Sequence, residues 1–213
     1  MDIINPEFQR YAETYTSPES EVLKQINRET HARILKPQML SGHLQGRLLA
    51  MISKMLMPKR ILEIGTYTGY SAICLAEGLQ GDGGLFTIDR NEELEEFARA
   101  AFTAAGVSDK ITFLLGDARE IVPTLNENFD LVFIDADKES YSTYFDLVID
   151  KLSSGGVILA DNVLRKGKVL QDKKDKDANA IHSFNEKVSN DARVEQILLP
   201  IRDGILMIRK LSL

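Results

Sequence analysis

The sequence predicts an α/β fold in which helices cover both faces of a doubly wound, mainly parallel sheet. From residue 60 onward, short β-rich runs alternate with segments whose apolar residues recur every three or four positions. Five of these runs end in a carboxylate. Two further β-rich runs near the end of the chain are joined by a turn too short for a parallel connection, so they must form an antiparallel pair.

Length and composition favour one domain. The 213 residues with 44% hydrophobic content can bury one sizeable core, and we expect a single domain spanning 1–213. Residues 1–57 form its helical cover and 58–213 its core. The formal net charge of -6 argues against a nucleic-acid coat or an anionic membrane surface as the default partner, although a local basic patch is compatible with it.

The compartment prediction rests on the single cysteine and the chain's first residues. Cys74 has no second cysteine to pair with, which suits a reducing compartment. Residues 1–17 lack the basic start and apolar centre of a signal peptide, and no apolar run approaches the ~20 residues of a membrane span. We therefore expect a cytoplasmic protein without a membrane partner.

The elements follow in chain order. The first 57 residues are typical of helices, with starts at Ser17-Pro18 and Ser41-Gly42, packed over one edge of the sheet. Gly106 and Gly155 mark helix exits. The predicted parallel strands are 60–65, 84–89, 111–117, 129–135 and 155–161, and the helices between them are 70–79, 91–106, 118–125 and 141–152. A helix at 178–190 then precedes an antiparallel hairpin of 193–199 and 204–210.

Right-handed βαβ units of this kind build a Rossmann-like sheet whose usual strand order is 3-2-1-4-5. Ligands bind such sheets at the carboxyl ends of the strands. A single acid at a strand end is commonly a cap or turn residue, but five in succession indicate a ligand site. The five are Glu63, Asp89, Asp117, Asp135 and Asp161.

The first strand runs into "EIGTYTGYS", a glycine-rich turn that opens a helix. Gly65 and Gly69 let the backbone approach a ligand closely. The turn is not G-x-G-x-x-G and lacks the lysine of a P-loop, which argues against a dinucleotide dehydrogenase and a nucleotide triphosphatase. Asp89 lies 20 residues after Gly69, the offset at which such sheets place an acid on ribose hydroxyls. Asp117 could accept a hydrogen bond from an adenine amine.

The motifs "ILEIGTYTGYS", "TIDR", "GDA", "FIDADK" and "LADN" together resemble the cation-dependent class I O-methyltransferases, the family of caffeoyl-CoA and catechol O-methyltransferases. The stretch "KPQMLSGHLQGRLLAMI" resembles the segment that closes over the methionine end of S-adenosylmethionine in that family. The resemblance implies a cofactor site of Met39, Ser41, Glu63, Gly65, Tyr67, Ser71, Asp89, Asp117, Ala118 and Asp135. It also implies Mg²⁺ or a similar ion on Asp135, Asp161 and Asn162, with Lys138 as the base and Asp135 beside it as a catalytic residue.

The chemistry of these residues agrees with the resemblance. Strands four and five are neighbours about 4.8 Å apart, so Asp135 and Asp161 project from adjacent ends and can share one cation. Asn162 adds a neutral oxygen, and an all-oxygen set suits Mg²⁺, Mn²⁺ or Ca²⁺ better than structural zinc. A phenol with a pKa near ~10 is mostly protonated at neutral pH, so the ion would promote its ionisation and Lys138 would accept the proton. We therefore expect a small vicinal diphenol as acceptor.

Several alternatives stay open at this stage. Some relatives methylate a hydroxyuridine in transfer RNA, and "RKGKV" and "KKDK" could form a basic rim for RNA. A cofactor-binding protein without catalysis is a third possibility. Residues 171–180 form either a solvated loop or a substrate lid, and a homodimer is an expectation from the family. Arg165 and the apolar stretch 197–199 depart from plant and animal members, so only a generic catechol or caffeoyl acceptor is supported.

Overall fold

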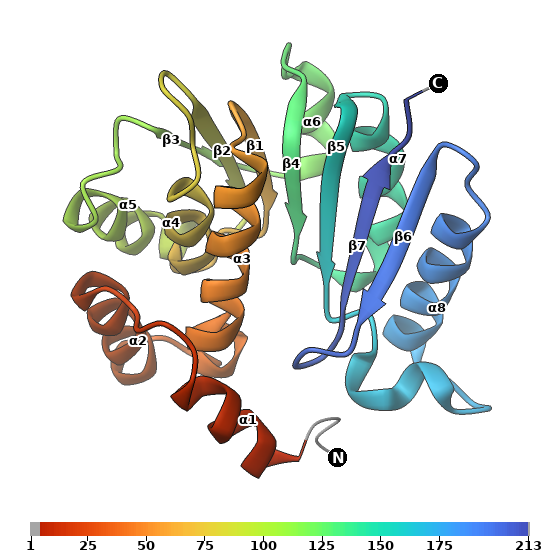
Figure 1. Cartoon of the computed structure of the whole chain (residues 1–213), viewed down its shortest axis with the longest axis horizontal. Coiled ribbons are helices and arrows are strands. Elements are labelled where there is room, and N and C mark those ends of the chain that lie inside the picture. The colour runs from red at the N-terminus through yellow and green to blue at the C-terminus, as the bar shows by residue number, and fades with distance from the viewer. Residues whose placement is uncertain (1–4, 213) are drawn as a thin grey trace.

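The computed structural model describes residues 5–212, and its strands form one seven-stranded sheet in the order β3-β2-β1-β4-β5-β7-β6. The first five strands are parallel, and β7 runs antiparallel between β5 and β6 (Figure 1). The predicted strand order and C-terminal hairpin are confirmed. The strands are β1 Arg60–Ile64, β2 Gly84–Asp89, β3 Ile111–Leu115, β4 Phe129–Ile134, β5 Leu152–Asp161, β6 Val194–Leu199 and β7 Ile205–Lys210.

Helices cover both faces of this sheet, which makes it doubly wound (Figure 1). Neighbouring strand residues therefore belong to opposite cores. Leu131 is part of the core that includes residues of α2, α3, α4 and α5, and Val132 is part of the core that includes residues of α6, α7 and α8. The helices are α1 Pro6–Thr14, α2 Glu21–Arg33, α3 Gly42–Leu56, α4 Tyr70–Ala76, α5 Glu95–Ala104, α6 Ala118–Thr124, α7 Tyr141–Ile149 and α8 Lys176–Ser189. Short 3₁₀ turns lie at Pro37–Met39, Glu92–Leu94, Lys138–Ser140 and Arg165–Leu170.

The helical N-terminal cover is present, with one boundary different from the prediction. The second helix begins at Glu21 rather than at Ser17-Pro18, because the Ser20 hydroxyl caps it by accepting the Leu23 N–H. Ser41 precedes α3 as predicted. Helix α1 buries none of its side chains and projects from the body of the protein (Figure 1). Residues 1–4 and 213 of the predicted domain lie outside the described residues.

Gly155 does not end a helix, which corrects the prediction. Helix α7 stops at Ile149 and β5 has already begun at Leu152, so Gly155 lies inside the strand with φ +76. The β4–β5 register shifts between Phe129 and Leu131 at this level. Irregularities of this kind commonly contain a residue with a left-handed backbone conformation, and glycine adopts that conformation without a Cβ penalty.

Beyond the irregularity the β4–β5 register positions the site. Ile134 pairs with Ala160, so the next residue on each strand, Asp135 and Asp161, emerges at the same level of the sheet edge. No described helix is both long and apolar enough to cross a membrane.

Candidate active site

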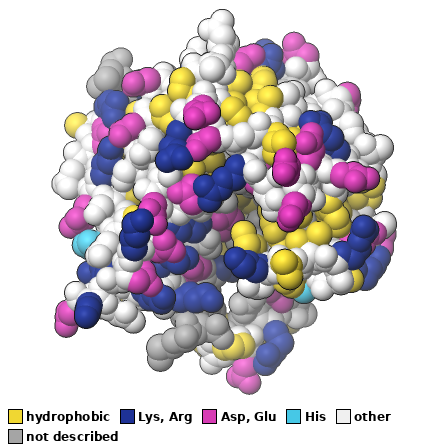
Figure 2. Space-filling model, turned by 180° about the vertical axis from the view of Figure 1, so that it is seen from behind, with side chains coloured by type: hydrophobic (Ala, Val, Ile, Leu, Met, Phe, Trp, Pro, Cys, Tyr) yellow, Lys and Arg dark blue, Asp and Glu magenta, His cyan; other side chains and the backbone are white. Residues whose placement is uncertain are grey.

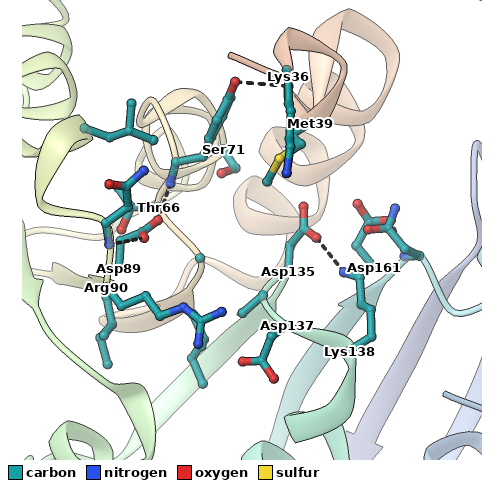
Figure 3. Close-up of a pocket in the computed structure, with 18 of the residues that line it drawn as sticks. Lys36, Met39, Thr66, Ser71, Asp89, Arg90, Asp135, Asp137, Lys138 and Asp161 are labelled. Atoms are coloured by element: carbon teal, nitrogen blue, oxygen red, sulfur yellow. Dashed lines mark hydrogen bonds and ion pairs between the residues drawn. The ribbon is translucent and has the colours of Figure 1, made fainter. Parts of the chain in front are cut away.

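A cavity of about 1520 Å³ opens at the carboxyl ends of the parallel strands. Every predicted site residue lines it except Glu63. The lining members of the predicted set are Met39, Ser41, Gly65, Tyr67, Ser71, Asp89, Asp117, Ala118, Asp135, Lys138, Asp161 and Asn162. Residues at or just after the ends of all five parallel strands therefore meet residues of the N-terminal cover in one space. Figure 3 shows part of this set, including Met39, Asp89, Asp135 and Asp161.

The turn after β1 passes so close to neighbouring elements that it requires its glycines. Gly65 has φ +107, and a Cβ there would come within 2.0 Å of the Asp135 carbonyl oxygen. Gly69 has φ +83, and its Cβ would lie 2.6 Å from the Phe102 ring. Any larger residue at either position would displace the turn. The glycines thus let the cofactor-type turn lie directly against the end of β4.

Asp89 holds this turn from β2. One carboxylate oxygen accepts the Tyr67 N–H at 2.8 Å, and the other accepts the Asn91 N–H at 2.9 Å (Figure 3). Tyr67, itself at φ +50, donates its hydroxyl to the Lys36 carbonyl at 3.2 Å. Because each carboxylate oxygen can accept more than one hydrogen bond, Asp89 keeps acceptor capacity for a ligand in the cavity.

Glu63 lies behind the cavity wall, not in it. Its side chain is fully buried, and burial raises the pKa of its carboxyl to about 8. One oxygen accepts the Thr87 hydroxyl, which in turn lies 2.5 Å from the Thr66 hydroxyl of the turn. The other oxygen has no hydrogen-bond partner among the described residues. Glu63 therefore supports the turn from behind without lining the cavity, and its place in the cofactor site stays a prediction.

Asp117 caps α6 by accepting the Arg119 N–H at 2.9 Å. It also pairs with the Arg119 guanidinium at 2.5 Å, and this pairing lowers the pKa of the Asp117 carboxyl to about 2. Asp117 is therefore an ionised carboxylate that caps α6 and forms an ion pair with Arg119. Its contact with an adenine amine stays a prediction.

Asp135 and Asp161 form the acidic end of the cavity. Asp161 is only 2% exposed, and burial followed by the nearby charge of Asp135 raises the pKa of its carboxyl to about 7. Asn162 adopts φ +61, a left-handed conformation that asparagine tolerates better than most residues.

Two adjacent carboxylates and an amide oxygen fit a hard divalent cation, since positive charge between the acids would relieve their repulsion. The described residues contain no cluster of three or more His, Cys, Asp or Glu able to hold a metal. A metal assignment thus depends on this pair of acids together with Asn162.

Lys138 is held against the acidic pair by two contacts. Its Nζ lies 3.0 Å from Asp135 Oδ1 and 2.6 Å from the Tyr141 hydroxyl oxygen. The buried Tyr141 hydroxyl in turn donates to the Asp161 carbonyl at 2.8 Å. Lys138, Asp135, Tyr141 and Asp161 therefore form one connected cluster, and Figure 3 shows the lysine reaching toward Asp135.

Sequence reasoning missed three residues of the site: Tyr141, Gln45 and Arg202. Tyr141 could have been found, because it follows Lys138 by three positions and such residues share a helical face. Gln45 hydrogen-bonds to Asp161 across 116 residues of sequence, and Arg202 to Gln45 across 157. No local pattern signals contacts of that range.

The segment predicted as a loop or lid is partly helical. Asp175 caps α8, which begins at Lys176, so 176–180 belong to a helix. Three of the basic residues nearby are paired with acids: Arg165 with Asp177 at 2.6 Å, Lys168 with Asp175 at 2.6 Å and Lys176 with Glu139 at 2.7 Å. These pairs reduce the positive charge that the sequence offers at this rim.

Comparisons with known proteins agree with this geometry. A family model described as O-methyltransferase matches residues 12–211. The chain is 35% identical to a caffeoyl-CoA O-methyltransferase of Mesembryanthemum crystallinum, covering 96% of this chain and 86% of the relative. It is 33% identical to a caffeoyl-CoA O-methyltransferase of Petroselinum crispum, covering 96% of this chain and 90% of that protein.

Solved structures are equally similar over nearly the whole chain. The SAH-bound methyltransferase PaMTH1 of Podospora anserina superposes with a TM-score of 0.90 at 30% identity, covering 98% of this chain and 97% of that one. An O-methyltransferase of Bacillus cereus in complex with SAH gives a TM-score of 0.88 at 29% identity, with coverages of 96% and 97%.

Proposed function

The chain belongs to the O-methyltransferase family and is an S-adenosylmethionine-dependent enzyme; we propose that it methylates a hydroxyl of a small catechol-type acceptor with the help of a divalent cation. The observation that carries this proposal is that the cofactor-type turn and the acidic pair share one cavity. Gly65 lies directly against the Asp135 backbone, so a methyl donor held by the turn would face the acids.

Asp135, Asp161 and Asn162 would hold the cation through three oxygen atoms. The fit is supported by the position of the two acids on adjacent strand ends and by the raised pKa of Asp161, which reflects burial and the nearby charge of Asp135. When bound, a hard divalent cation supplies Lewis acidity that promotes ionisation of a phenol. Mg²⁺, Mn²⁺ and Ca²⁺ all suit this donor set.

The chain's own residues perform the rest of the reaction. Asp89 binds the ribose hydroxyls of the cofactor, and Met39 and Ser41 line the same cavity. The neutral amine of Lys138 accepts the phenolic proton, and Tyr141 holds that amine in place. The phenol oxygen then bonds to the methyl carbon while the carbon–sulfur bond breaks, and the sulfur keeps the electron pair. Much of the rate enhancement comes from holding oxygen and methyl group in line.

A vicinal diphenol fits this arrangement best. Two neighbouring oxygens can reach the acidic end together, one presented to Lys138 and the other anchoring the ring. A single hydroxyl would leave the ring free to rotate away from the methyl group, so the reacting oxygen would be aligned with that group less often. The pairing of a base with an anchor for two oxygens is what supports this acceptor class.

The experiment measures transfer of a labelled methyl group to catechol, phenol and resorcinol. Catechol should react far faster than the other two, and a chelator should abolish its turnover until Mg²⁺ or Mn²⁺ is restored. SAH binding, followed by calorimetry, should persist in chelator and so separate loss of metal from loss of fold. Equal rates for the three acceptors would contradict the two-oxygen anchor, and full activity in chelator would contradict the role of a cation.

The distribution of charged side chains does not support RNA as the alternative acceptor. Three basic side chains near the cavity mouth, Arg165, Lys168 and Lys176, are paired with acids. Acidic and basic side chains interleave across the face shown in Figure 2 instead of forming a continuous basic stripe. A homodimer and a cytoplasmic location stay predictions.

A further inference from the structure

The Asp161 carboxylate is oriented by a glutamine from a distant helix. One of its oxygens accepts the Asn162 N–H at 2.7 Å, and the other accepts the Gln45 amide N–H at 2.7 Å. Gln45 is only 1% exposed, so water does not replace this donor. Among the described residues, Gln45 therefore supplies the side-chain hydrogen bond that sets the rotation of this carboxylate.

The orientation of the Gln45 amide is itself unambiguous. Its carbonyl oxygen accepts from Arg202 Nη1 at 2.8 Å while its NH₂ group faces Asp161. The flipped amide would place NH₂ against a guanidinium and oxygen against a carboxylate, so both contacts would be repulsive. Arg202, Gln45 and Asp161 form a chain in which each group fixes the next.

Arg202 also holds the segment at the cofactor end of the cavity. Its guanidinium donates to the Leu40 carbonyl at 3.2 Å from both Nη1 and Nη2, and Nη1 also donates to the Ser41 carbonyl. Leu40 and Ser41 line the cavity just before α3 begins. One guanidinium thus contacts both the cofactor-side segment and, through Gln45, the acidic end.

The turn that carries Arg202 is firmly anchored. It joins β6 to β7, and Arg202 adopts φ +51, a conformation that non-glycine residues keep only where surrounding contacts impose it. Asp203 and Gly204 accept backbone N–H groups from Leu164 and Val163 at 2.9 and 3.1 Å. The turn is therefore tied to the chain just after Asn162 as well as to the start of α3.

We propose that Arg202 and Gln45 are positioning residues that couple the cofactor-side segment to Asp161, so that cofactor and divalent cation each bind more tightly in the presence of the other. The proposal rests on the proposed metal-dependent function. A cofactor that binds Leu40 and Ser41 in the arrangement seen here would further stabilise the contacts of Arg202 and Gln45, and with them the Asp161 rotamer that would bind the metal. Such coupling is reciprocal, so either ligand can report it.

The test is calorimetric titration of Mn²⁺ into the purified protein with and without saturating SAH. In the wild type, SAH should raise Mn²⁺ affinity by about fivefold or more, within the usual range for coupled sites. Gln45→Leu keeps the approximate volume but removes both hydrogen bonds. It should lower Mn²⁺ affinity by about 10-fold to 100-fold, as outer-shell losses commonly do, and abolish the effect of SAH.

Arg202→Lys removes the forked geometry that serves Gln45 and the two carbonyls at once. It should reduce the SAH effect to less than about twofold while lowering Mn²⁺ affinity less than Gln45→Leu does. The double variant should be no worse than Gln45→Leu alone, because two members of one chain do not act additively. Arg209→Lys is the matched control, since Arg209 lies on the same hairpin in an exposed pair with Glu195. It should retain both affinity and coupling.

Thermal unfolding of each variant verifies folding, and Arg202→Lys keeps the test available if Gln45→Leu is unstable. A folded Gln45→Leu or Arg202→Lys protein with wild-type coupling would overturn the relay, as would additive losses in the double variant. A wild type that binds Mn²⁺ without any effect of SAH would also overturn it. Absence of Mn²⁺ binding to the wild type would instead overturn the proposed metal dependence, so the two failures are distinguishable.

Discussion

The Nζ of Lys138 lies 3.0 Å from Asp135 Oδ1, so the predicted base and the predicted metal ligand form an ion pair. Both side chains are largely buried, with 10% and 21% of their surfaces exposed. In this arrangement the lysine ammonium is the counter-charge of the carboxylate. A divalent cation on Asp135 would take over that role and repel the ammonium, which would first lose its own proton to solvent. The resulting neutral amine could then accept a proton from the acceptor.

Lys138→Met should lower kcat by roughly 10² to 10⁴-fold, the usual loss for a general base, because the side chain keeps its length but cannot accept a proton. SAH affinity should stay unchanged in calorimetry. The loss should shrink for catechols acidic enough to ionise unaided, which steady-state rates across an acidity series would show. Lys24→Met is a matched control, since Lys24 also pairs with an acid three residues earlier but on α2. A fully active Lys138→Met protein would exclude the lysine from proton transfer.

Tyr141→Phe should reduce turnover by about tenfold to 100-fold with little change in KM, because the amine of Lys138 loses its lateral support. The ring would keep its edge-on packing against Phe184, at a centroid distance of 5.4 Å. Loss of the donor to the buried Asp161 carbonyl should also cost about 1 to 3 kcal/mol of unfolding free energy. Urea denaturation and initial rates measure the two effects separately.

The control for this change is Tyr70→Phe, which removes a buried hydroxyl that donates to Glu19 rather than to the Lys138 cluster. It should destabilise the protein without a comparable loss of kcat at saturating cofactor. If both variants lose turnover in proportion to stability, Tyr141 has only a structural role.

Local patterns predicted the fold because separate features of the sequence indicate the same arrangement of strands and helices. The β-rich runs, the acids at their ends and the turn glycines all lie where the sheet needs them, and the strand order follows from right-handed crossovers. The errors are at boundaries. Gly155 was predicted to end a helix because glycine commonly does so, whereas here it relieves an irregularity between β4 and β5 that depends on strand pairing.

The site was predicted where residues follow strand ends and missed where contacts span the chain. Asp89, Asp135, Lys138 and Asp161 reach the cavity because their strands end there. Glu63 shares the strand-end pattern, but its side chain is fully buried in contact with Thr87 and does not line the cavity. Gln45 and Arg202 could not be assigned, since their roles depend on how α3 and the β6–β7 turn pack against β5.

Asp89→Ala should weaken SAH binding by about 1 to 3 kcal/mol, the range for losing a hydrogen bond to a charged group. The change removes both the acceptor for the ribose and the clamp on the Tyr67 and Asn91 N–H groups. Asp89→Asn keeps one acceptor oxygen and should lose less. Calorimetry measures both, with Asp109→Ala as an exposed control. Unchanged affinity in a folded Asp89→Ala protein would refute the ribose assignment.

Glu63 should make the metal-free protein less stable as pH rises. Burial raises the pKa of its carboxyl from 4.5 to about 8, so between these values the folded state keeps a proton that the unfolded state has lost. The free energy of unfolding should therefore fall with rising pH across this window, by up to about 1.4 kcal/mol per pH unit for the one group. Asp161, with a carboxyl pKa raised to about 7, should add a slope of the same sign in chelator.

Glu63→Gln isolates this contribution, because the amide keeps an acceptor for the Thr87 hydroxyl but cannot ionise. Urea denaturation in chelator at pH 5, 6, 7 and 8 should show a clearly shallower decline than in the wild type, with the remaining slope due to Asp161. Glu120→Gln changes an exposed acid and should reproduce the wild-type slope. A wild-type stability that is constant or increases between pH 5 and 8 would contradict a protonated Glu63, as would identical slopes for wild type and Glu63→Gln. Agreement would show that the glycine-rich turn after β1 is supported by a carboxyl that burial keeps neutral.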